Sequence, residues 1–327
     1  MKILALLARR LGNGLALLLG VLVLNFALIH LAPGDVADTI AGDMGGADAE
    51  VMAQIRHDYG LDLPFHEQLA RYMSGVVKLD LGYSFFFNQS VTKLILERLP
   101  ATLLLILSAQ ILAVAVGTVL GVMAARRPNS LLSHGVTVLA LLGFSAPVFW
   151  TGILLIILFC SIFPLFPVAG MVDVTVEGGW FVQALDVLHH LFLPMVTLAS
   201  IFLALYSRLA RASMLDVLGT DYVRTAQAKG LSEFQVVYKH ALRNALGPVV
   251  TLAGFQFSGI VSGAVLVETV FTWPGLGSLA FQAITARDAP TVLGILFFSS
   301  LVVIVANLAT DLVHSIIDPR IKLGHPG

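Results

Sequence analysis

The chain has 327 residues, of which 57% are hydrophobic and 12% are charged, and its formal net charge is −1. A soluble domain carries about 25% charged residues, so most of this protein's surface must face something other than water. The near-zero net charge provides no basic field to hold nucleic acid. The single cysteine, Cys160, excludes intrachain disulfides and four-cysteine metal sites. The composition predicts an integral membrane protein.

Six stretches without Asp, Glu, Lys or Arg mark the expected membrane spans. A helix needs about 20 mostly apolar residues to cross the hydrocarbon core, and five of the six stretches have 21 to 27 residues. The third stretch, residues 128–172, is long enough for one span and a loop or for two spans. We expect an all-α protein with spans near residues 9–31, 99–125, 134–163, 188–210, 246–270 and 290–314.

The basic residues favour six spans with both termini in the cytoplasm. Short cytoplasmic loops are rich in Lys and Arg, and this arrangement places the bases between Arg208 and Arg243 inside. A seventh span within 128–172 would move that block outside. The first stretch also has the charge pattern of a cleaved signal peptide, but its 24 uncharged residues exceed the apolar region of about 7–15 residues in such peptides. We therefore expect a retained first span.

The first outer loop, residues 32–98, is the longest soluble segment expected. Apolar residues from Phe65 to Val77 recur at helical spacing, with charged residues between them. This pattern predicts an amphipathic helix. Such a helix lies against the outer membrane face or a partner subunit, or it packs on the protein's own outer rim, and the sequence favours neither alternative.

The inner segment between the fourth and fifth spans, residues 211–246, is rich in basic residues. Asp221 to Gly230 predicts a short helix that ends at a glycine, and a second helix is expected to begin at Leu231–Phe234. Two short helices joined at a glycine are suited to docking another protein. The basic residues taken alone would also bind anionic lipid headgroups.

No motif in the sequence indicates an enzyme. There is no Walker A motif, no His-Glu-x-x-His, no Gly-x-Ser-x-Gly and no Cys-x-x-Cys. His189 and His190 are adjacent, and neighbouring residues on a helix point about 100° apart, so we interpret the pair as interfacial rather than as a metal site. We expect the chain itself to hold no metal, no cofactor and no catalytic residue.

Short motifs run along most of the chain. The inner segment reads Tyr-Val-Arg-Thr-Ala-Gln-Ala-Lys-Gly-Leu at 222–231 and His-Ala-Leu-Arg-Asn-Ala-Leu-x-Pro at 240–248. The others are Pro33-Gly34-Asp35, Tyr59-Gly60-Leu61-Asp62-x-Pro64, Asp80-Leu81-Gly82-x-Ser84, Glu268-Thr269-Val270-Phe271-x-Trp273-Pro274-Gly275-Leu276-Gly277 and Asp318-Pro319-Arg320. Together they resemble the permeases of bacterial ATP-binding-cassette (ABC) importers, in the branch that serves dipeptides, oligopeptides, nickel and glutathione. The long first outer loop is similar to that of the B-type permease of these systems.

The resemblance implies the ABC importer permease fold, as a single membrane domain over residues 1–327 with a periplasmic loop at 32–98 and a cytoplasmic coupling loop at 211–246. It implies a multi-pass protein of the bacterial inner membrane that forms the translocation path for peptides or similar small solutes. The implied partners are a second homologous permease, two ATPase subunits and a periplasmic substrate-binding protein, with no nucleic acid. The ATPases would bind ATP and magnesium, so this chain would be a non-catalytic subunit.

The resemblance also assigns residues that couple the permease to the ATPases. They are Asp221, Tyr222, Arg224, Thr225, Ala226, Ala228, Lys229, Gly230 and Leu231. Two positions depart from the wider family pattern, because Arg224 and Thr225 stand where general importer permeases carry Glu and Ala. Gln227 replaces an arginine that is common in the peptide branch.

The end of the fifth span predicts a break in the helix at the outer membrane face. Pro274 cannot donate a backbone hydrogen bond, and the glycines after it allow unusual turns. A loop at this depth is tolerated only where it is buried or lines a cavity. The predicted outer gate and translocation path comprise Glu268, Phe271, Trp273, Pro274, Gly275 and Gly277. Phe271 and Trp273 would supply apolar bulk, whereas Glu268 would either face a substrate amino group or hydrogen-bond the broken helix end.

Two other functions are alternatives to the importer permease. An ion-gradient-driven secondary transporter usually has paired broken helices and ionisable relays at mid-membrane. A non-transporting subunit, such as a respiratory-chain component, would be expected to carry mid-membrane charge or cofactor ligands. The centres of the expected spans carry almost no charge, so we favour the importer permease and keep the secondary transporter as the main alternative.

Overall fold

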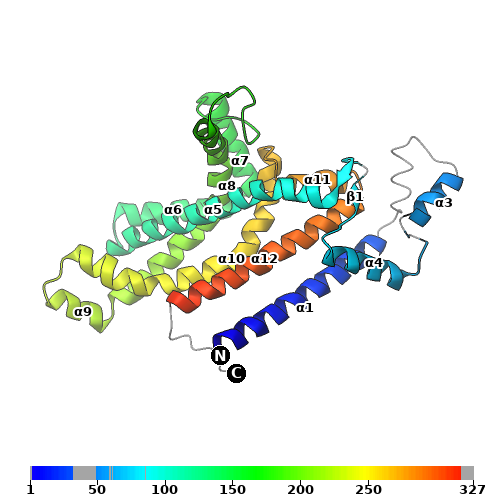
Figure 1. Ribbon diagram of the computed structural model, residues 1–327. Helices are drawn as coiled ribbons and strands as arrows, with labels where there is room; N and C mark the ends of the chain where they lie inside the picture. Colours follow the sequence, from blue (N-terminus) through cyan, green and yellow to red (C-terminus); the bar gives the residue numbers. More distant parts are fainter. Residues whose placement is uncertain (1, 32–48, 59, 61, 85, 318–327) are drawn as a thin grey trace. The chain divides into compact units, whose positions relative to one another are not determined.

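The structure is a computed structural model that describes residues 2–31, 49–58, 60, 62–84 and 86–317 (Figure 1). The motifs at Pro33-Gly34-Asp35 and Asp318-Pro319-Arg320 lie outside the described residues, as do Tyr59 and Leu61. The outer loop predicted at 32–98 is therefore described only in part.

The described chain is built almost entirely of helices. In chain order they are α1 (Lys2–Leu31), α3 (Ala49–Asp58), α4 (Phe65–Val77), α5 (Val91–Arg126), α6 (Leu131–Ser145), α7 (Val148–Ile156), the π-helical turn η1 (Ile157–Ile162), α8 (Trp180–Leu218), α9 (Asp221–Ala228), the π-helical η2 (Gln235–Ala241), α10 (Leu242–Val270), α11 (Leu276–Thr285) and α12 (Ala289–Ile317). Strands β1 (Tyr83–Ser84) and β2 (Gln89–Ser90) form an antiparallel hairpin between α4 and α5.

Four helices in the described residues are long and apolar enough to cross a membrane. They are Val91–Arg126, Trp180–Leu218, Gln235–Val270 and Ala289–Thr310, and they contain most or all of the second, fourth, fifth and sixth predicted spans. The first predicted span coincides with the 30-residue α1, of which Gly12–Ala27 forms a shorter apolar helix. The protein is therefore a multi-pass membrane protein.

The third predicted span, 134–163, is not one continuous helix, and this detail of the sequence prediction was wrong. α6 ends at Ser145 and α7 begins at Val148, with Pro147 in an extended conformation (φ −60°, ψ 138°) between them. Proline lacks an N–H and disfavours helical backbone at the residue before it. The chain therefore breaks at Ala146–Pro147, and neither helical piece alone reaches the length of about 20 residues that a span needs.

The described chain groups into two compact units. Unit 1 comprises Met1–Thr102 and Pro274–Ile304, and unit 2 comprises Leu103–Trp273 and Val305–Gly327. The core of unit 1 is formed by Leu22, Val76, Leu81, Val91, Leu94, Ile95, Leu276, Leu279, Ile295, Phe297 and Phe298. This core joins α1, α4, the start of α5, α11 and the start of α12.

In unit 1, α4 packs on α1. The ring of Phe26 in α1 lies 5.5 Å from that of Tyr72 and 5.3 Å from that of Phe65, measured between centroids. Val76 is buried and Val77 is 85% exposed, as expected for an amphipathic helix. The helix predicted at Phe65–Val77 is thus confirmed, and it packs on the protein's own first helix, which is one of the two alternatives that the sequence left open.

The β1–β2 hairpin is tied to the start of α12. Ser84 Oγ and Thr291 Oγ1 both donate to Oδ2 of Asp288, at 2.5 and 2.6 Å. All three side chains are buried. Because a buried carboxylate is costly unless it is hydrogen-bonded, these donors hold Asp288 at the position just before α12. No sequence pattern predicts this hairpin, since its strands have only two residues each.

In unit 2, α6, α7 and α10 pack against α8. α5 approaches α8 closely at two glycines. A Cβ atom at Gly117 would lie 2.9 Å from the carbonyl oxygen of Leu203, and one at Gly121 would lie 2.5 Å from that of Ser207. Small residues four positions apart allow this kind of backbone contact. The same part of α5 therefore cannot accept larger residues at these two positions without moving away from α8.

Candidate functional site

The inner segment forms a short helix, α9, that ends at a glycine, as the sequence predicts. Asp221 in the first turn suits the positive end of the helix dipole. At the other end, Gly230 has φ +76° and its N–H donates to the carbonyl of Gln227 at 2.9 Å. A left-handed residue after the last turn is a common helix terminator. A Cβ at Gly230 would meet nothing within 4 Å, so the backbone angle alone favours glycine here.

The second helix of this segment differs from the prediction. Helical backbone begins at Glu233, continues through the π-helical η2 and runs without interruption into α10. The start near Phe234 was expected, but a separate short helix was not found, because no glycine or proline lies between residues 234 and 246 to stop it. α9 therefore connects through one turn to a helix that extends to Val270.

α9 has one buried face and one exposed face. Its Val223 and Ala226 are buried in a cluster with residues of α5, α8, η2 and α10. The members are Val122, Ala125, Met214, Val223, Ala226, Val236, Val237, Ala241 and Ala245. Of the predicted coupling residues, Asp221, Tyr222, Arg224, Thr225, Ala228, Lys229 and Gly230 are exposed, Leu231 is half-buried and Ala226 is buried. Ala226 thus fixes α9 to the protein, and the exposed residues are free to meet a partner.

Polar contacts fasten the same segment from two further sides. Arg126, the last residue of α5, donates from Nε and Nη2 to Oε1 of Glu233, at 3.0 and 2.7 Å. Tyr222 on α9 accepts a hydrogen bond at 2.7 Å from Nδ2 of Asn244 on α10. No pattern in the sequence predicts these contacts of Arg126, Glu233 and Asn244. The partners of the ion pair are 107 positions apart, so no local pattern reveals it.

The predicted break after the fifth span is confirmed. α10 ends at Val270, and the N–H of Trp273 then donates to the carbonyl of Glu268 at 2.8 Å. The unusual turn occurs at Thr272, with φ +51°, and not at Gly275 or Gly277, neither of which has a positive φ. The physical reason is that Trp273 precedes Pro274 and is restricted to extended backbone, so the chain must change direction one residue earlier.

Three of the predicted gate residues lie in unit 2 and are fully or almost fully buried. The exposed fraction is 0% for Glu268, 2% for Phe271 and 0% for Trp273. The ring of Phe271 packs on α7, where a Cβ at Gly152 would lie 3.2 Å from its Cε2 atom. The Glu268 side chain is fully shielded from water. A buried carboxylate of this kind must be paired or hydrogen-bonded.

The remaining gate residues belong to unit 1, where Pro274 and Gly275 precede α11 and Gly277 lies in its first turn. Gly275 is the residue before the helix, in extended backbone (φ −105°, ψ −175°), and Gly277 is buried in its first turn. The N–H of Leu276 donates to Oγ1 of Thr102 on α5, at 2.7 Å. This bond satisfies one of the free N–H groups at the start of α11. The helix α11 itself was not expected from the sequence.

Comparisons with known proteins show the family to which this chain belongs. Residues 117–323 match the family described as binding-protein-dependent transport system inner membrane component, and residues 3–106 match its N-terminal family. The chain is 40% identical to the di/tripeptide transport system permease protein DppB of Pseudomonas aeruginosa, over 98% of this chain and 99% of that protein. It is 39% identical to the dipeptide transport system permease protein DppB of Escherichia coli K12, over 96% and 97% of the two chains.

The fold is also similar to a solved structure. An inward-facing structure of the MetNI methionine ABC transporter aligns with a TM-score of 0.51 at 18% sequence identity, covering 69% of this chain and 96% of that chain. This likeness confirms the permease fold that the sequence motifs imply. The chain belongs to the family of binding-protein-dependent transport system inner membrane components, and it is a membrane permease subunit of an ABC importer.

Proposed function

We propose that this chain is one of two homologous permease subunits that form the path for peptides or similar small solutes delivered by an outer binding protein. The observation that carries the proposal is the identity of about 40% over nearly the whole chain to permeases named for dipeptide and di/tripeptide transport. The chain crosses the bacterial inner membrane six times with both termini inside, the arrangement that its basic residues favour. The third crossing is then made jointly by α6 and by α7 with η1, on the two sides of the break at Pro147.

Energy enters through α9. The exposed residues of α9 dock on an ATPase subunit, and the two partner ATPases bind the ATP and magnesium that the reaction needs. α9 is fixed to η2 and α10 by a buried cluster and by the Asn244–Tyr222 hydrogen bond. Because η2 continues into α10, a displacement of α9 moves a helix that ends beside Phe271 and Trp273. The coupling helix and the outer gate are thus opposite ends of one connected element.

The outer gate closes the path with the side chains of Phe271 and Trp273. Their burial supports this role, since an apolar plug must exclude water to be effective. The buried Glu268 favours one other candidate function, because an ionisable residue inside the membrane is what an ion-gradient-driven transporter uses. The two functions differ in their energy source and are therefore separable by experiment.

Uptake of a radiolabelled dipeptide tests the proposal. Cells lacking this chain, and the same cells carrying it on a plasmid, are compared with and without arsenate, which depletes ATP, and with and without a protonophore. We expect uptake that requires the chain, is abolished by arsenate and persists with the protonophore while ATP is maintained. Uptake that survives arsenate and collapses with the protonophore would establish the secondary transporter instead.

A further inference from the structure

The segment between η1 and α8, residues 163–179, is fastened to the rest of unit 2 at several points. It carries the acids Asp173 and Glu177 and no base. Most of its side chains are exposed, so it has little hydrophobic core of its own. Its position depends on a small number of polar contacts and on the ring of Phe166, which stacks on that of Phe192 in α8 at 4.8 Å between centroids. Of the residues in the polar contacts, only Phe271 was given a role by the sequence motifs.

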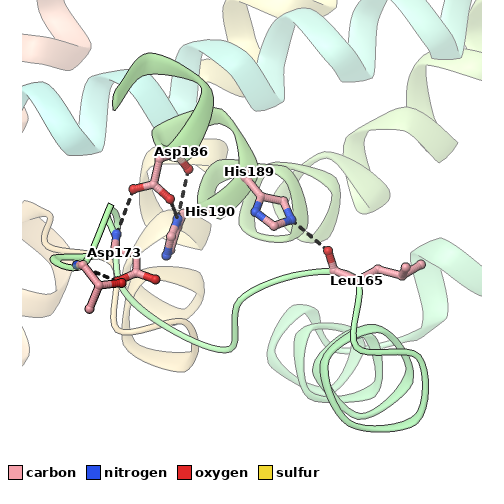
Figure 2. A network of polar contacts seen from close by, with 6 residues as sticks. Leu165, Asp173, Asp186, His189 and His190 are labelled. Atoms are coloured by element: carbon pink, nitrogen blue, oxygen red, sulfur yellow. Dashed lines mark hydrogen bonds and ion pairs between the residues drawn. The ribbon is translucent and has the colours of Figure 1, made fainter. Parts of the chain in front are cut away.

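Asp186 on α8 is the centre of the first fastening (Figure 2). Its Oδ1 lies 3.2 Å from Nδ1 of His190, one helical turn further along, and its Oδ2 accepts the backbone N–H of Asp173 at 2.8 Å. The exposed fractions of the His190 and Asp186 side chains are only 6% and 11%. Shielding from water strengthens such contacts. Oδ2 of this carboxylate therefore links α8 to the 163–179 segment, and the contact of Oδ1 with His190 within α8 holds the carboxylate in place.

Two more contacts order the segment on either side of Asp173. Thr175 donates its N–H and its Oγ1 to Oδ1 of Asp173, at 2.9 and 2.7 Å, which makes a tight turn. These hydrogen bonds, together with the nearby His190, lower the pKa of the Asp173 carboxyl. On the other side, Nε2 of His189 lies 2.8 Å from the carbonyl oxygen of Leu165 (Figure 2). His189 thus contacts the segment directly, whereas His190 contacts Asp186, which in turn binds the segment.

The middle of the segment reaches the end of α10. The N–H of Gly170 donates to the carbonyl oxygen of Phe271 at 3.0 Å. Carbonyl groups at the end of a helix have no partner within the helix, so this bond caps α10 just before Trp273. Gly170 has φ +88°, a conformation that favours glycine. Phe271 therefore contacts α7 through its ring and the 163–179 segment through its backbone carbonyl.

We propose that Asp186 is a positioning residue for the outer gate, which acts by holding the 163–179 segment on the end of α10. The inference rests on the proposed gate role of Phe271 and Trp273. Loss of the Asp186 carboxylate frees the segment at Asp173. The segment then no longer holds the carbonyl of Phe271, so Phe271 and Trp273 close the path less tightly. A looser seal lets the complex pass through its outward-open state without the binding protein, so ATP is hydrolysed without transport.

The experiment measures ATPase activity and dipeptide uptake of the complete complex, purified with this chain as the tagged subunit and reconstituted in vesicles. Asp186→Ala removes both contacts, and Gly170→Ala disturbs the opposite end of the same link through its backbone angle. A Cβ at Gly170 would meet only the carbonyl oxygen of Val172, at 3.9 Å, so this variant keeps the packing. We expect both variants to raise the ATPase rate without binding protein several-fold and to lower the peptide transported per ATP.

Two matched controls lie in the same segment. Glu177→Gln removes an exposed charge, and Gly179→Ala places a methyl group where nothing lies within 4 Å and φ is −69°. Both should match the unchanged protein. Subunit assembly is checked by co-purification. His190→Gln, which keeps a polar side chain without the imidazole, should give an intermediate ATPase rate.

The outcomes separate the inference from the proposed function. If the unchanged complex shows ATP-driven uptake and the Asp186 and Gly170 variants behave like the two controls, the inference is wrong and the function stands. If these variants lose ATPase activity and uptake in the same proportion, Asp186 is merely structural, and the inference is again wrong. If the unchanged complex transports no peptide, the proposed function fails first.

Discussion

Arg126, at the end of α5, donates two hydrogen bonds to a single carboxylate oxygen of Glu233, at the start of the helix that becomes α10. The two residues are only partly shielded, with exposed side-chain fractions of 32% and 67%. An ion pair this exposed contributes at most about 1 kcal/mol to stability. Its importance is geometric, because it joins the last residue of α5 to the helix that follows α9.

The first prediction follows from that geometry. Glu233→Gln should lower the uptake obtained per ATP hydrolysed while leaving the thermal stability of the complex within about 1 kcal/mol of normal. The double variant Arg126→Glu with Glu233→Arg should recover most of the loss, since it restores an opposite-charge pair. A double-mutant cycle on transport measures the coupling between the two sites. Strictly additive effects would show that the pair has no joint role.

The second prediction concerns the glycine that ends α9. Gly230→Val should insert into the membrane but abolish ATP-dependent uptake, because a β-branched residue cannot adopt φ +76° without strain. Gly230→Asn should retain much of the activity, since asparagine adopts left-handed backbone more readily. The pair of variants separates backbone conformation from side-chain contact. Equal activity of the valine and asparagine variants would contradict the claim that uptake requires left-handed backbone at residue 230.

The third prediction concerns Tyr72 in the outer loop. Its hydroxyl is buried without a hydrogen-bond partner, and burial raises the pKa of Tyr72 to about 12. Tyr72→Phe removes this unsatisfied group and keeps the ring stacked on Phe26, so stability should be unchanged or higher by about 1 kcal/mol. Thermal unfolding of the purified complex measures the difference, and a clear loss of stability would mean that the hydroxyl has a partner after all.

The raised pKa of Tyr72 also determines the direction in which stability changes with pH. The ordinary pKa of tyrosine is about 10, so the folded state holds the phenol proton more tightly than the unfolded chain. The contribution of this proton binding to the free energy of unfolding is fully present below pH about 10 and is lost as the pH rises through about 12. Absorbance of the phenolate should therefore show one tyrosine titrating near pH 12 that is missing in Tyr72→Phe.

The fourth prediction separates the residues of the outer gate. Trp273→Ala removes a large buried side chain. The complex that carries it should let small solutes leak across the membrane, or should hydrolyse ATP faster in the absence of the binding protein. Glu268→Gln keeps the shape of the buried side chain and removes its charge. If Glu268 faces substrate amino groups, this variant should transport amine-bearing peptides poorly with normal assembly. Normal transport would assign Glu268 a structural role at the helix end, and selectivity would then rest with the binding protein.

Local patterns in the sequence predicted the features that depend on one segment. Charge-free runs located the long helices, and the spacing of Phe65 to Val77 predicted α4. The combination of Pro274 with the apolar residues before it predicted the end of α10. Each of these features follows from helical periodicity or from the chemistry of a single residue.

Features that depend on distant residues were not predictable in the same way. The contact of Arg126 with Glu233 and that of Asp186 with the backbone of Asp173 arise only when separate helices or loops meet. Pro147 is present in the sequence, but a charge-free run does not predict the break there, because hydropathy carries no information about backbone hydrogen bonding. The turn at Thr272 was assigned to the nearby glycines, since threonine seldom adopts positive φ.

The central claim is that the exposed face of α9 docks on an ATPase subunit, and site-directed cross-linking tests it most directly. Cys160 is replaced by alanine, and single cysteines are placed at Ala228 on α9 and, as a control, at Ile111, which is 68% exposed on α5. Membranes containing the whole complex are treated with benzophenone maleimide, which attaches to the introduced thiol and on illumination inserts into a C–H bond of whatever chain lies beside it. We predict a cross-link from position 228 to an ATPase subunit, weakened or strengthened by ATP, and none from position 111. Absence of any ATPase cross-link from position 228, with intact complex and normal labelling of that cysteine, would contradict the account.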